Sequence, residues 1–229
     1  MAQTAPIVLT RDEYHLKIRR NVDALKARLN LAPYFVPDKE QDKVRRYFME
    51  RAVQVGEACF RISDLQMPLF ALARVLCEDF FTLYWVSLSD KNASDYCKRT
   101  VSEMAKMLEK HIANKRIRVR EISTGKDVTV DALKKITPHV TKKKRIEQIA
   151  TESGLGKVYD IVYRYDCLEV HGNTFGLSEA ECAMDGIAVA ASAVNALLRV
   201  ILLVVDNQDR IVTADEVLST LNMRHVPGT

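Results

Sequence analysis

The sequence predicts a single all-α domain, built as a helical bundle with a long apolar final helix. Apolar residues recur at three- and four-residue steps along most of the chain, which is the period of a helix. Two capping-box sequences, Thr10-x-x-Glu13 and Ser178-x-x-Glu181, mark helix starts, and no alternating strand pattern persists. With 229 residues, 48% of them hydrophobic and 28% charged, the composition suits one globular domain.

Residues 1–63 are expected to form an N-terminal pair of helices. The first begins after Thr10 and presents Ile18, Val22, Leu25 and Leu29 on one face. Pro33 and Pro37 interrupt the chain, and Asp38 is placed to cap the second helix. The apolar stripe of that second helix consists of Val44, Phe48, Ala52, Val55, Cys59 and Ile62.

Two further helices are expected to follow this pair. The third has Pro68 in its first turn and is apolar on nearly all sides from Leu69 to Leu88, which predicts burial on most sides. The fourth runs from about Asn92 to Arg120 and has a weaker stripe. That stripe consists of Val101, Met104, Met107 or Leu108, and Ile112.

The segment from Glu121 to Thr141 has irregular patterning. We expect a turn or short extended piece around Gly125, then a short helix over 131–136 that ends before Pro138. A helix over about 142–152, closed by Gly154 and Gly156, precedes another over about 157–171.

The last long helix begins at the Ser178 capping box and extends to Val205. Residues 186–205 carry almost no charge and are numerous enough to cross a membrane. Asn195 and Arg199 lie in the middle of this stretch, where each would be costly in lipid. We therefore expect the centre of a soluble bundle (core 64–206) and no membrane partner, followed by a short amphipathic helix within 207–229.

The number and spacing of the cysteines, and the motifs that the sequence lacks, argue against several classes of binding site and enzyme. The five cysteines are odd in number and include no Cys-x-x-Cys pair, which favours neither a zinc site nor a disulfide framework. The N-terminus lacks the basic and apolar regions of a signal peptide. No glycine-rich phosphate loop, dinucleotide fingerprint or His-Glu-x-x-His sequence occurs. We expect a cytoplasmic protein with no metal and no cofactor.

Arg164 and His171 are the candidate catalytic residues. They stand seven apart on a helix expected to be continuous, so they project about 20° apart and about 10 Å apart along the axis. Both lie at the rim of the apolar face, and histidine titrates near neutral pH. The alternative is a surface arginine and a histidine that binds the last helix carbonyls. The apolar face consists of Val158, Ile161, Val162, Tyr165 and Leu168.

The stretch from Tyr159 to Asn173 resembles the Arg-x(4–6)-His signature of the HEPN superfamily, with six residues between Arg164 and His171. HEPN domains are all-helical, and many are metal-independent ribonucleases of toxin–antitoxin and anti-phage systems. More narrowly, residues 65–206 resemble uncharacterised bacterial proteins with a HEPN-like core. In those proteins a helix with arginine and glutamate four apart, here Arg74 and Glu78, precedes the motif.

The resemblance implies an endoribonuclease that cleaves RNA by attack of the ribose 2′-hydroxyl on the adjacent phosphate. His171 would be the general acid or base and Arg164 would bind the phosphorane oxygens. It also implies a homodimer, in which two motifs face each other across a cleft, and an antitoxin protein as partner.

The sequence departs from the HEPN pattern directly after the arginine. Active members usually have Asn, Asp or His there, whereas this chain has Tyr165, with Asp166 next. The alternative function is therefore a non-catalytic HEPN-like module that binds RNA, a nucleotide or a protein partner. A structural component of a defence complex is a third reading.

Supporting residues surround the motif in the sequence. Arg74 and Glu78 share one face of the most apolar helix, where a buried ion pair would need further partners. Glu169 falls within the apolar face of the motif helix and is the expected partner of Arg74; Asn173 closes the matched stretch. The group is expected either to orient the motif helix or to contact the reacting groups.

A basic run separates the fourth helix from the motif. The excess of basic over acidic residues in this run is far larger than the net charge of +4 for the whole chain. Such a local positive charge is suited to binding a polyanion such as RNA. The alternative is a solvated excursion, and no interleaved aromatic residues indicate base stacking. The expected RNA-binding residues are Arg116, Arg118, Arg120, Lys142, Lys143, Lys144 and Arg145.

Overall fold

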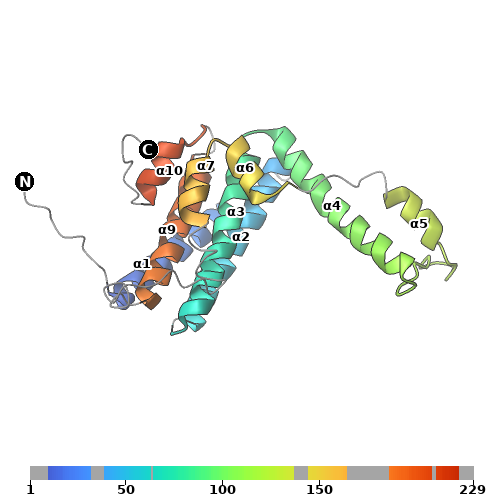
Figure 1. Ribbon diagram of the computed structural model, residues 1–229, viewed down its shortest axis with the longest axis horizontal. Helices are drawn as coiled ribbons and strands as arrows, with labels where there is room; N and C mark the ends of the chain where they lie inside the picture. Colours follow the sequence, from blue (N-terminus) through green and yellow to red (C-terminus); the bar gives the residue numbers. More distant parts are fainter. Residues whose placement is uncertain are drawn as a thin grey trace, which may run out of the picture.

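The computed structural model describes residues 10–31, 39–62, 64–136, 144–163, 186–207 and 210–221. Within these ranges every regular element is a helix, and the only strand-like feature is an isolated bridge between Arg120 and Asp127 (Figure 1). The predicted all-α class is therefore confirmed.

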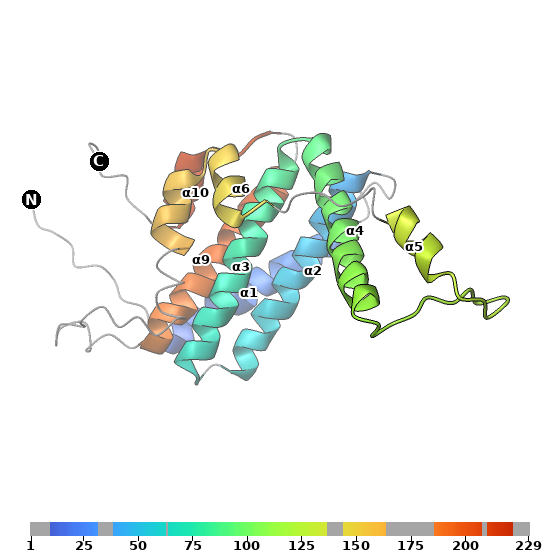
Figure 2. The ribbon, with the colours of Figure 1, turned by 45° about the vertical axis from the view of Figure 1, so that its right-hand side comes forward.

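Four long helices form the bundle: α1 (Arg11–Leu29), α2 (Glu40–Arg61), α3 (Gln66–Ser87) and α9 (Gly186–Asp206). α3 packs most extensively against α9, α1 lies against both α9 and α2, and α2 lies against α3 (Figures 1 and 2). The largest fully buried side chains include Phe70, Phe80 and Phe81, so α3 supplies much of the core.

The N-terminal pair follows the sequence closely. The Glu13 carboxylate accepts a hydrogen bond from the Thr10 N–H at 2.7 Å, completing the predicted capping box. At Gly56 of α2 an added Cβ would lie 2.3 Å from Val22 Cγ2, so α1 and α2 approach closely there. The predicted cap of α2 by Asp38 is wrong: Lys39 occupies the cap position and makes no side-chain bond, and Asp38 lies outside the described residues.

The C-terminal half of α3 is buried all round, as predicted, whereas its N-terminal half has an exposed side. Every residue from Asp79 to Val86 is buried, and Pro68 is the third residue of the helix. A buried helix of this kind needs apolar neighbours on all sides. α2, α4, α6 and α9 supply them.

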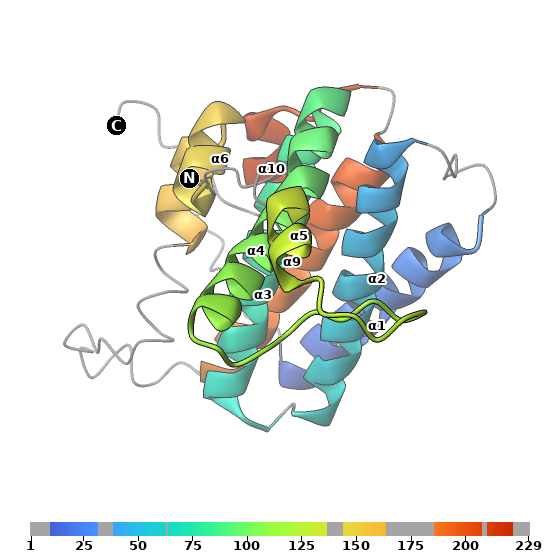
Figure 3. The same cartoon turned by 90° about the vertical axis from the view of Figure 1, so that its right-hand side faces the viewer.

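α4 (Asp90–Ala113) is shorter than predicted and leaves the bundle. Lys115 adopts a left-handed φ of 56°, and the helix ends before it instead of reaching Arg120. Val101 and Met107 of the predicted stripe are 46% and 52% exposed, so these two positions were predicted wrongly, whereas the alternative Leu108 and Ile112 are half-buried. The cause is that the distal half of α4 projects away from the bundle, to the right in Figure 1 and toward the viewer in Figure 3.

α5 (Thr129–Ile136) packs on the projecting part of α4. The turn before it is closed by the Arg120–Asp127 bridge, and Gly125 has a φ of 67° that suits glycine. The predicted turn and short helix are thus both present.

Short elements cover one end of the bundle. α6 (Ile146–Glu152), which begins four residues later than expected, and the π-helix η3 (Tyr159–Tyr163) pack on α3, and α7 (Gly156–Val158) joins them. Gly154 ends α6 with a φ of 76°, whereas Gly156 begins α7. α10 (Ala214–Thr220) is the predicted short final helix and contacts α9 and α7.

α9 carries the long apolar stretch. Residues 187–206 have the length and composition to cross a membrane, and 61% of the most apolar window is buried inside the bundle. Core helices of soluble proteins share these properties. Asn195, in the middle of α9, is 7% exposed and accepts a hydrogen bond from Asn21 of α1.

Candidate functional site

Three polar side chains meet beside α3, and we call them the α3 cluster: Arg74, Glu78 and Tyr163. The Tyr163 hydroxyl donates to Glu78 Oε1 at 2.9 Å, and Arg74 Nη2 donates to the Tyr163 oxygen at 3.3 Å. Arg74 Nε lies 3.4 Å from Glu78 Oε1, and its guanidinium sits 5.5 Å from the centre of the Tyr163 ring. The cluster therefore joins the end of η3 to α3 by charge-assisted bonds and a cation–π contact.

Aromatic packing positions Tyr163. Its ring stacks on that of Tyr159 with centroids 4.9 Å apart and planes at 19°, and Tyr159 meets Phe81 of α3 at 5.9 Å. The i→i+5 bonding of a π-helix is wider than that of an α-helix, and such turns often occur at functional sites. Here it places two tyrosines, four residues apart, toward the bundle.

The helix predicted over 157–171 is present in its described part, but most of that part is a π-helix and not an α-helix. Only Gly156–Val158 is α-helical, and η3 follows. Within the predicted apolar face Val158 is buried but Ile161 is 47% exposed. The stacking of Tyr159 and Tyr163 against α3 rotates the segment and turns Ile161 outward.

Most motif residues lie outside the described residues. Residues 164–185 include the candidate catalytic residues and their neighbours, and the described segment ends at Tyr163, directly before Arg164. The structure thus places only the approach to the motif. The residues outside are Arg164, Tyr165, Asp166, Glu169, His171 and Asn173.

The expected burial of the Arg74–Glu78 pair is wrong. The two side chains are 27% and 42% exposed, because the pair lies where α3 meets η3 at the edge of the bundle. Within the described residues Arg74 binds Glu78 and Tyr163; its predicted partner, Glu169, lies outside them. The sequence analysis missed Tyr163, although its position beside Arg164 was a signal.

The predicted RNA-binding residues fall into separate groups. Arg116, Arg118 and Arg120 are exposed on the chain between α4 and α5. Lys144 instead donates to Glu152 at 2.6 Å and lies 4.9 Å from the Trp85 ring centre. Arg145 is the cap residue of α6, and Lys142 and Lys143 lie outside the described residues.

A hollow of about 230 Å³ lies beside Lys144. Cations line this hollow, but Trp85 is only 4% exposed and Lys144 lies over its ring, so the Trp85 ring is not open for base stacking. The predicted RNA-binding set did not include Trp85, because its place in an apolar helix gave no signal of RNA binding. The lining residues are Trp85, Asp95, Tyr96, Lys98, Arg99, Lys144 and Ile149.

Asp79 is a buried carboxyl that the sequence analysis did not single out. Burial raises its pKa to about 6, against the opposing effect of Arg51, whose Nε donates to Asp79 Oδ2 at 2.9 Å. The negative charge of Glu78 raises the pKa further. Asp79 therefore titrates near neutral pH, facing α2.

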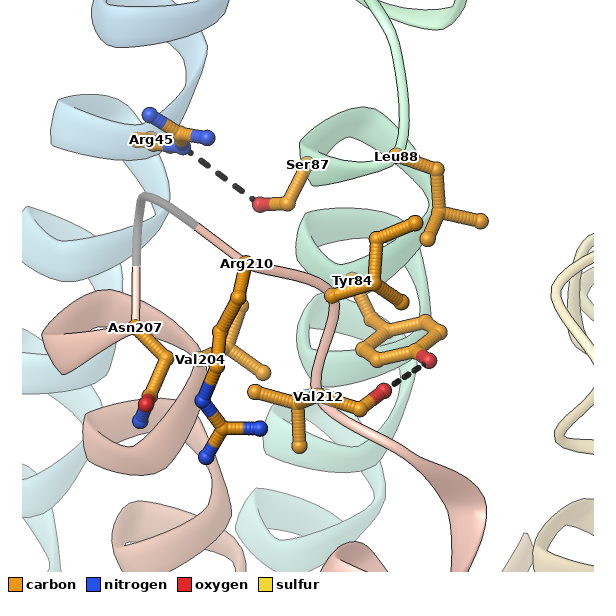
Figure 4. A pocket seen from close by; sticks show the side chains of 9 residues that line it. Arg45, Tyr84, Ser87, Leu88, Val204, Asn207, Arg210 and Val212 are labelled. Atoms are coloured by element: carbon orange, nitrogen blue, oxygen red, sulfur yellow. Dashed lines mark hydrogen bonds between the residues drawn. The ribbon is translucent and has the colours of Figure 1, made fainter.

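A small cavity near the end of α9 is structural (Figure 4). Its volume of about 10 Å³ is about that of one water. The Tyr84 hydroxyl donates to the Val212 carbonyl, and Arg45 Nε donates to Ser87 Oγ at 3.4 Å. The first bond holds the chain after α9 against α3, and the second joins α2 to the end of α3.

Side chains that could bind a metal ion or form a disulfide do not gather in one place in the described part of the chain. No group of three or more His, Cys, Asp or Glu side chains there is arranged to hold a metal ion. Cys59, Cys77 and Cys97 form no disulfide within those ranges, and burial raises the pKa of Cys59 to about 12. A thiol of that kind is a poor nucleophile.

The chain was compared with protein families, curated proteins and solved structures. Neither curated proteins nor solved structures gave a match. A model of a family of unknown function, DUF5677, matches residues 63–183, more than half of the chain. This range spans the α3 cluster, the projecting α4–α5 segment and the motif. The protein is accordingly a member of the DUF5677 family.

Proposed function

We propose that this protein is a metal-independent endoribonuclease of HEPN type. His171 acts as the general base that removes the proton of the attacking ribose 2′-hydroxyl, or as the general acid that protonates the 5′-oxygen as it leaves. Arg164 neutralises the negative charge on the phosphorane oxygens. The products are a 2′,3′-cyclic phosphate and a 5′-hydroxyl. DNA, which lacks the attacking hydroxyl, is no substrate.

The observation that carries the proposal is the anchoring of Tyr163 to α3. Its bonds to Glu78 and Arg74 hold the residue that directly precedes Arg164. A phosphate-binding arginine needs a rigid backbone, because a small displacement of its guanidinium from the reacting phosphate lowers the rate strongly. We therefore assign a positioning role to the α3 cluster, whose Arg74 and Glu78 side chains are partly exposed at the edge of the bundle.

The proposal includes a cytoplasmic homodimer. One arginine and one histidine are few groups for phosphoryl chemistry, and a second protomer doubles them. Arg116, Arg118 and Arg120 supply exposed positive charge for the RNA backbone. An antitoxin protein is proposed as the natural inhibitor.

A non-catalytic HEPN-like module is the second candidate. Tyr165 follows Arg164 where active members usually have a smaller polar residue or histidine. The cations Lys98 and Arg99 in the hollow beside Lys144 favour a version of this module that binds RNA or a nucleotide through its phosphates.

The deciding experiment is cleavage of single-stranded RNA by the purified wild type in excess EDTA. His171→Ala and Arg164→Ala should each lower cleavage by at least about a hundredfold. An otherwise identical RNA with 2′-O-methyl groups is the matched substrate control and should stay intact.

Melting temperatures of the two variants should stay close to that of the wild type. Activity that persists in His171→Ala, or a wild-type dimer that cleaves no RNA, would exclude the enzyme. Retained RNA binding without cleavage would favour the non-catalytic module.

A further inference from the structure

A polar hollow lies where α1 packs against α9. We call it the α1–α9 hollow. Its volume is about 380 Å³, within the range of small-molecule sites. Each helix contributes residues one turn apart, which share a face. The lining residues are Lys17, Arg20 and Asn21 of α1, and Asn195 and Arg199 of α9.

The lining contains three cations and no carboxylate. Within the described residues no ion pair involves Lys17, Arg20 or Arg199. Two acids of α1 flank these residues in sequence. Asp23, three residues after Arg20, does not line the hollow and forms no ion pair within the described residues. The Glu13 carboxylate is bound by Thr10 and only weakly affected by Lys17. Like charges gathered without a counter-ion repel, so the hollow favours an anion.

Other cations on α1 contrast with these three. Lys26 pairs with Glu57 at 2.6 Å, and Arg28 binds both oxygens of Asp206 at 2.5 and 2.7 Å. Arg28 even bridges the same two helices as the hollow does. The missing counter-charge is therefore local to the hollow.

Asn195 adds an oriented amide to the site. It is 7% exposed, and Asn21 Nδ2 donates to its Oδ1 at 2.9 Å. This bond uses the carbonyl oxygen of the Asn195 amide, and the amide Nδ2 makes no hydrogen bond within the described residues. Amide and guanidinium donors together match the oxygens of a phosphate group.

We propose that the α1–α9 hollow binds the phosphate groups of a small ligand that carries two or more of them. Three unpaired cations suit a multiply charged anion better than a single carboxylate. The lining has no aromatic ring, so it recognises the phosphates and not a stacked base. Asn195 and Arg199 thereby acquire a role within an otherwise apolar helix.

The test is calorimetric titration of the full chain with inorganic pyrophosphate and tripolyphosphate, in low salt without divalent cations. The wild type should bind both, and Arg20→Met and Arg199→Met should each weaken binding at least about tenfold, since each removes a charge-assisted contact. Arg19→Met is the matched control. It removes one charge from the same helix, but Arg19 stacks on Phe60 outside the hollow.

Asn195→Asp sharpens the result. This variant keeps an oxygen that accepts the hydrogen bond from Asn21, but it replaces the Nδ2 donor of Asn195 with a negative charge. Binding of pyrophosphate and tripolyphosphate should therefore be lost. Circular dichroism melting checks that each variant is folded. Undiminished binding in the Arg20, Arg199 and Asn195 variants, or no binding by the wild type, would overturn the proposal.

A nuclease-resistant 2′-O-methyl RNA separates the hollow from the proposed nuclease. If this RNA binds through Arg20 and Arg199 while pyrophosphate does not, the hollow belongs to an RNA path and the small-ligand proposal fails. RNA cleavage by Arg199→Met should equal that of the wild type. The two proposals can therefore fail independently.

Discussion

The α3 cluster and the α1–α9 hollow both bring arginine together with neutral polar groups, but they balance charge differently. In the cluster Arg74 lies against a carboxylate and a tyrosine, Glu78 and Tyr163. In the hollow Arg20 and Arg199 share a space with a lysine and two amides. The positive charge of the α3 cluster is balanced by a carboxylate of the same chain, whereas the positive charge of the hollow requires an external anion.

This difference separates a positioning role from a binding role. Paired ions fix geometry, since each partner restricts the other. Unpaired cations keep their donors for a ligand, at some cost to the stability of the free protein. Stability measurements can therefore tell the two regions apart, and the following predictions are ordered by expected effect.

The largest effect is expected at Asp79, next to the α3 cluster. Arg51→Met removes its cation and leaves a buried carboxylate without its charged donor, which should cost about 1–3 kcal/mol of unfolding free energy at pH 8. Urea unfolding at several pH values measures this. Arg46→Met, which breaks the exposed pair with Glu50 on the same helix, is the control and should cost at most about 1 kcal/mol.

The pH dependence of this loss has a definite sign. The folded pKa of Asp79, about 6, is above its usual value, so folding favours the protonated form. That contribution to stability is present below the unfolded pKa and is lost as the pH rises through 6. In Arg51→Met the loss should shrink toward zero at acid pH, where Asp79 is neutral; a loss independent of pH would mean that Arg51 acts through packing alone.

A smaller effect is expected inside the α3 cluster. Tyr163→Phe removes only the hydroxyl that joins Glu78 and Arg74, and should cost about 1 kcal/mol. In a Glu78→Ala background the same change should cost much less, because the acceptor is already absent. Additive costs in this double-mutant cycle would show that the cluster does not hold η3 to α3.

The sequence predicted where the helices lie along the chain better than it predicted which helices pack against one another. Local signals suffice for α1, where Thr10 and Glu13 form the capping box and Val22 lies on the predicted apolar face. The same reasoning failed for Val101, because the exposure of distal α4 depends on how far the bundle extends. A helical period shows which residues share a face, but not whether another element covers that face.

The candidate sites show the same limit. Arg74 and Glu78 were predicted as a pair from their spacing, yet their contact with Tyr163 depends on a π-helix that no residue period indicates. Asn195 and Arg199 were noticed only as polar residues in an apolar helix. The partner of Asn195, Asn21, lies 174 positions away, so only the fold brings the hollow together.

The smallest expected effect concerns the free α1–α9 hollow. Arg199→Met removes one of three mutually repelling charges and keeps most of the side-chain stem. It should therefore raise the unfolding free energy in low salt by about 0.5 kcal/mol. Unfolding by urea in 20 mM and 500 mM salt measures this, and the gain should disappear at the higher concentration, where ions screen the repulsion.

Arg28→Met is the matched control for this prediction. Arg28 lies on α1 and bridges to α9, but it binds Asp206 through two nitrogens. Its replacement removes an attraction, so it should lower stability in low salt. Opposite signs for Arg199 and Arg28 would show that the two ends of one helix interface differ in charge balance. If Arg199→Met instead destabilises the protein as much as Arg28→Met does, then Arg199 already has an anionic partner within the chain, and the hollow needs no ligand to balance its charge.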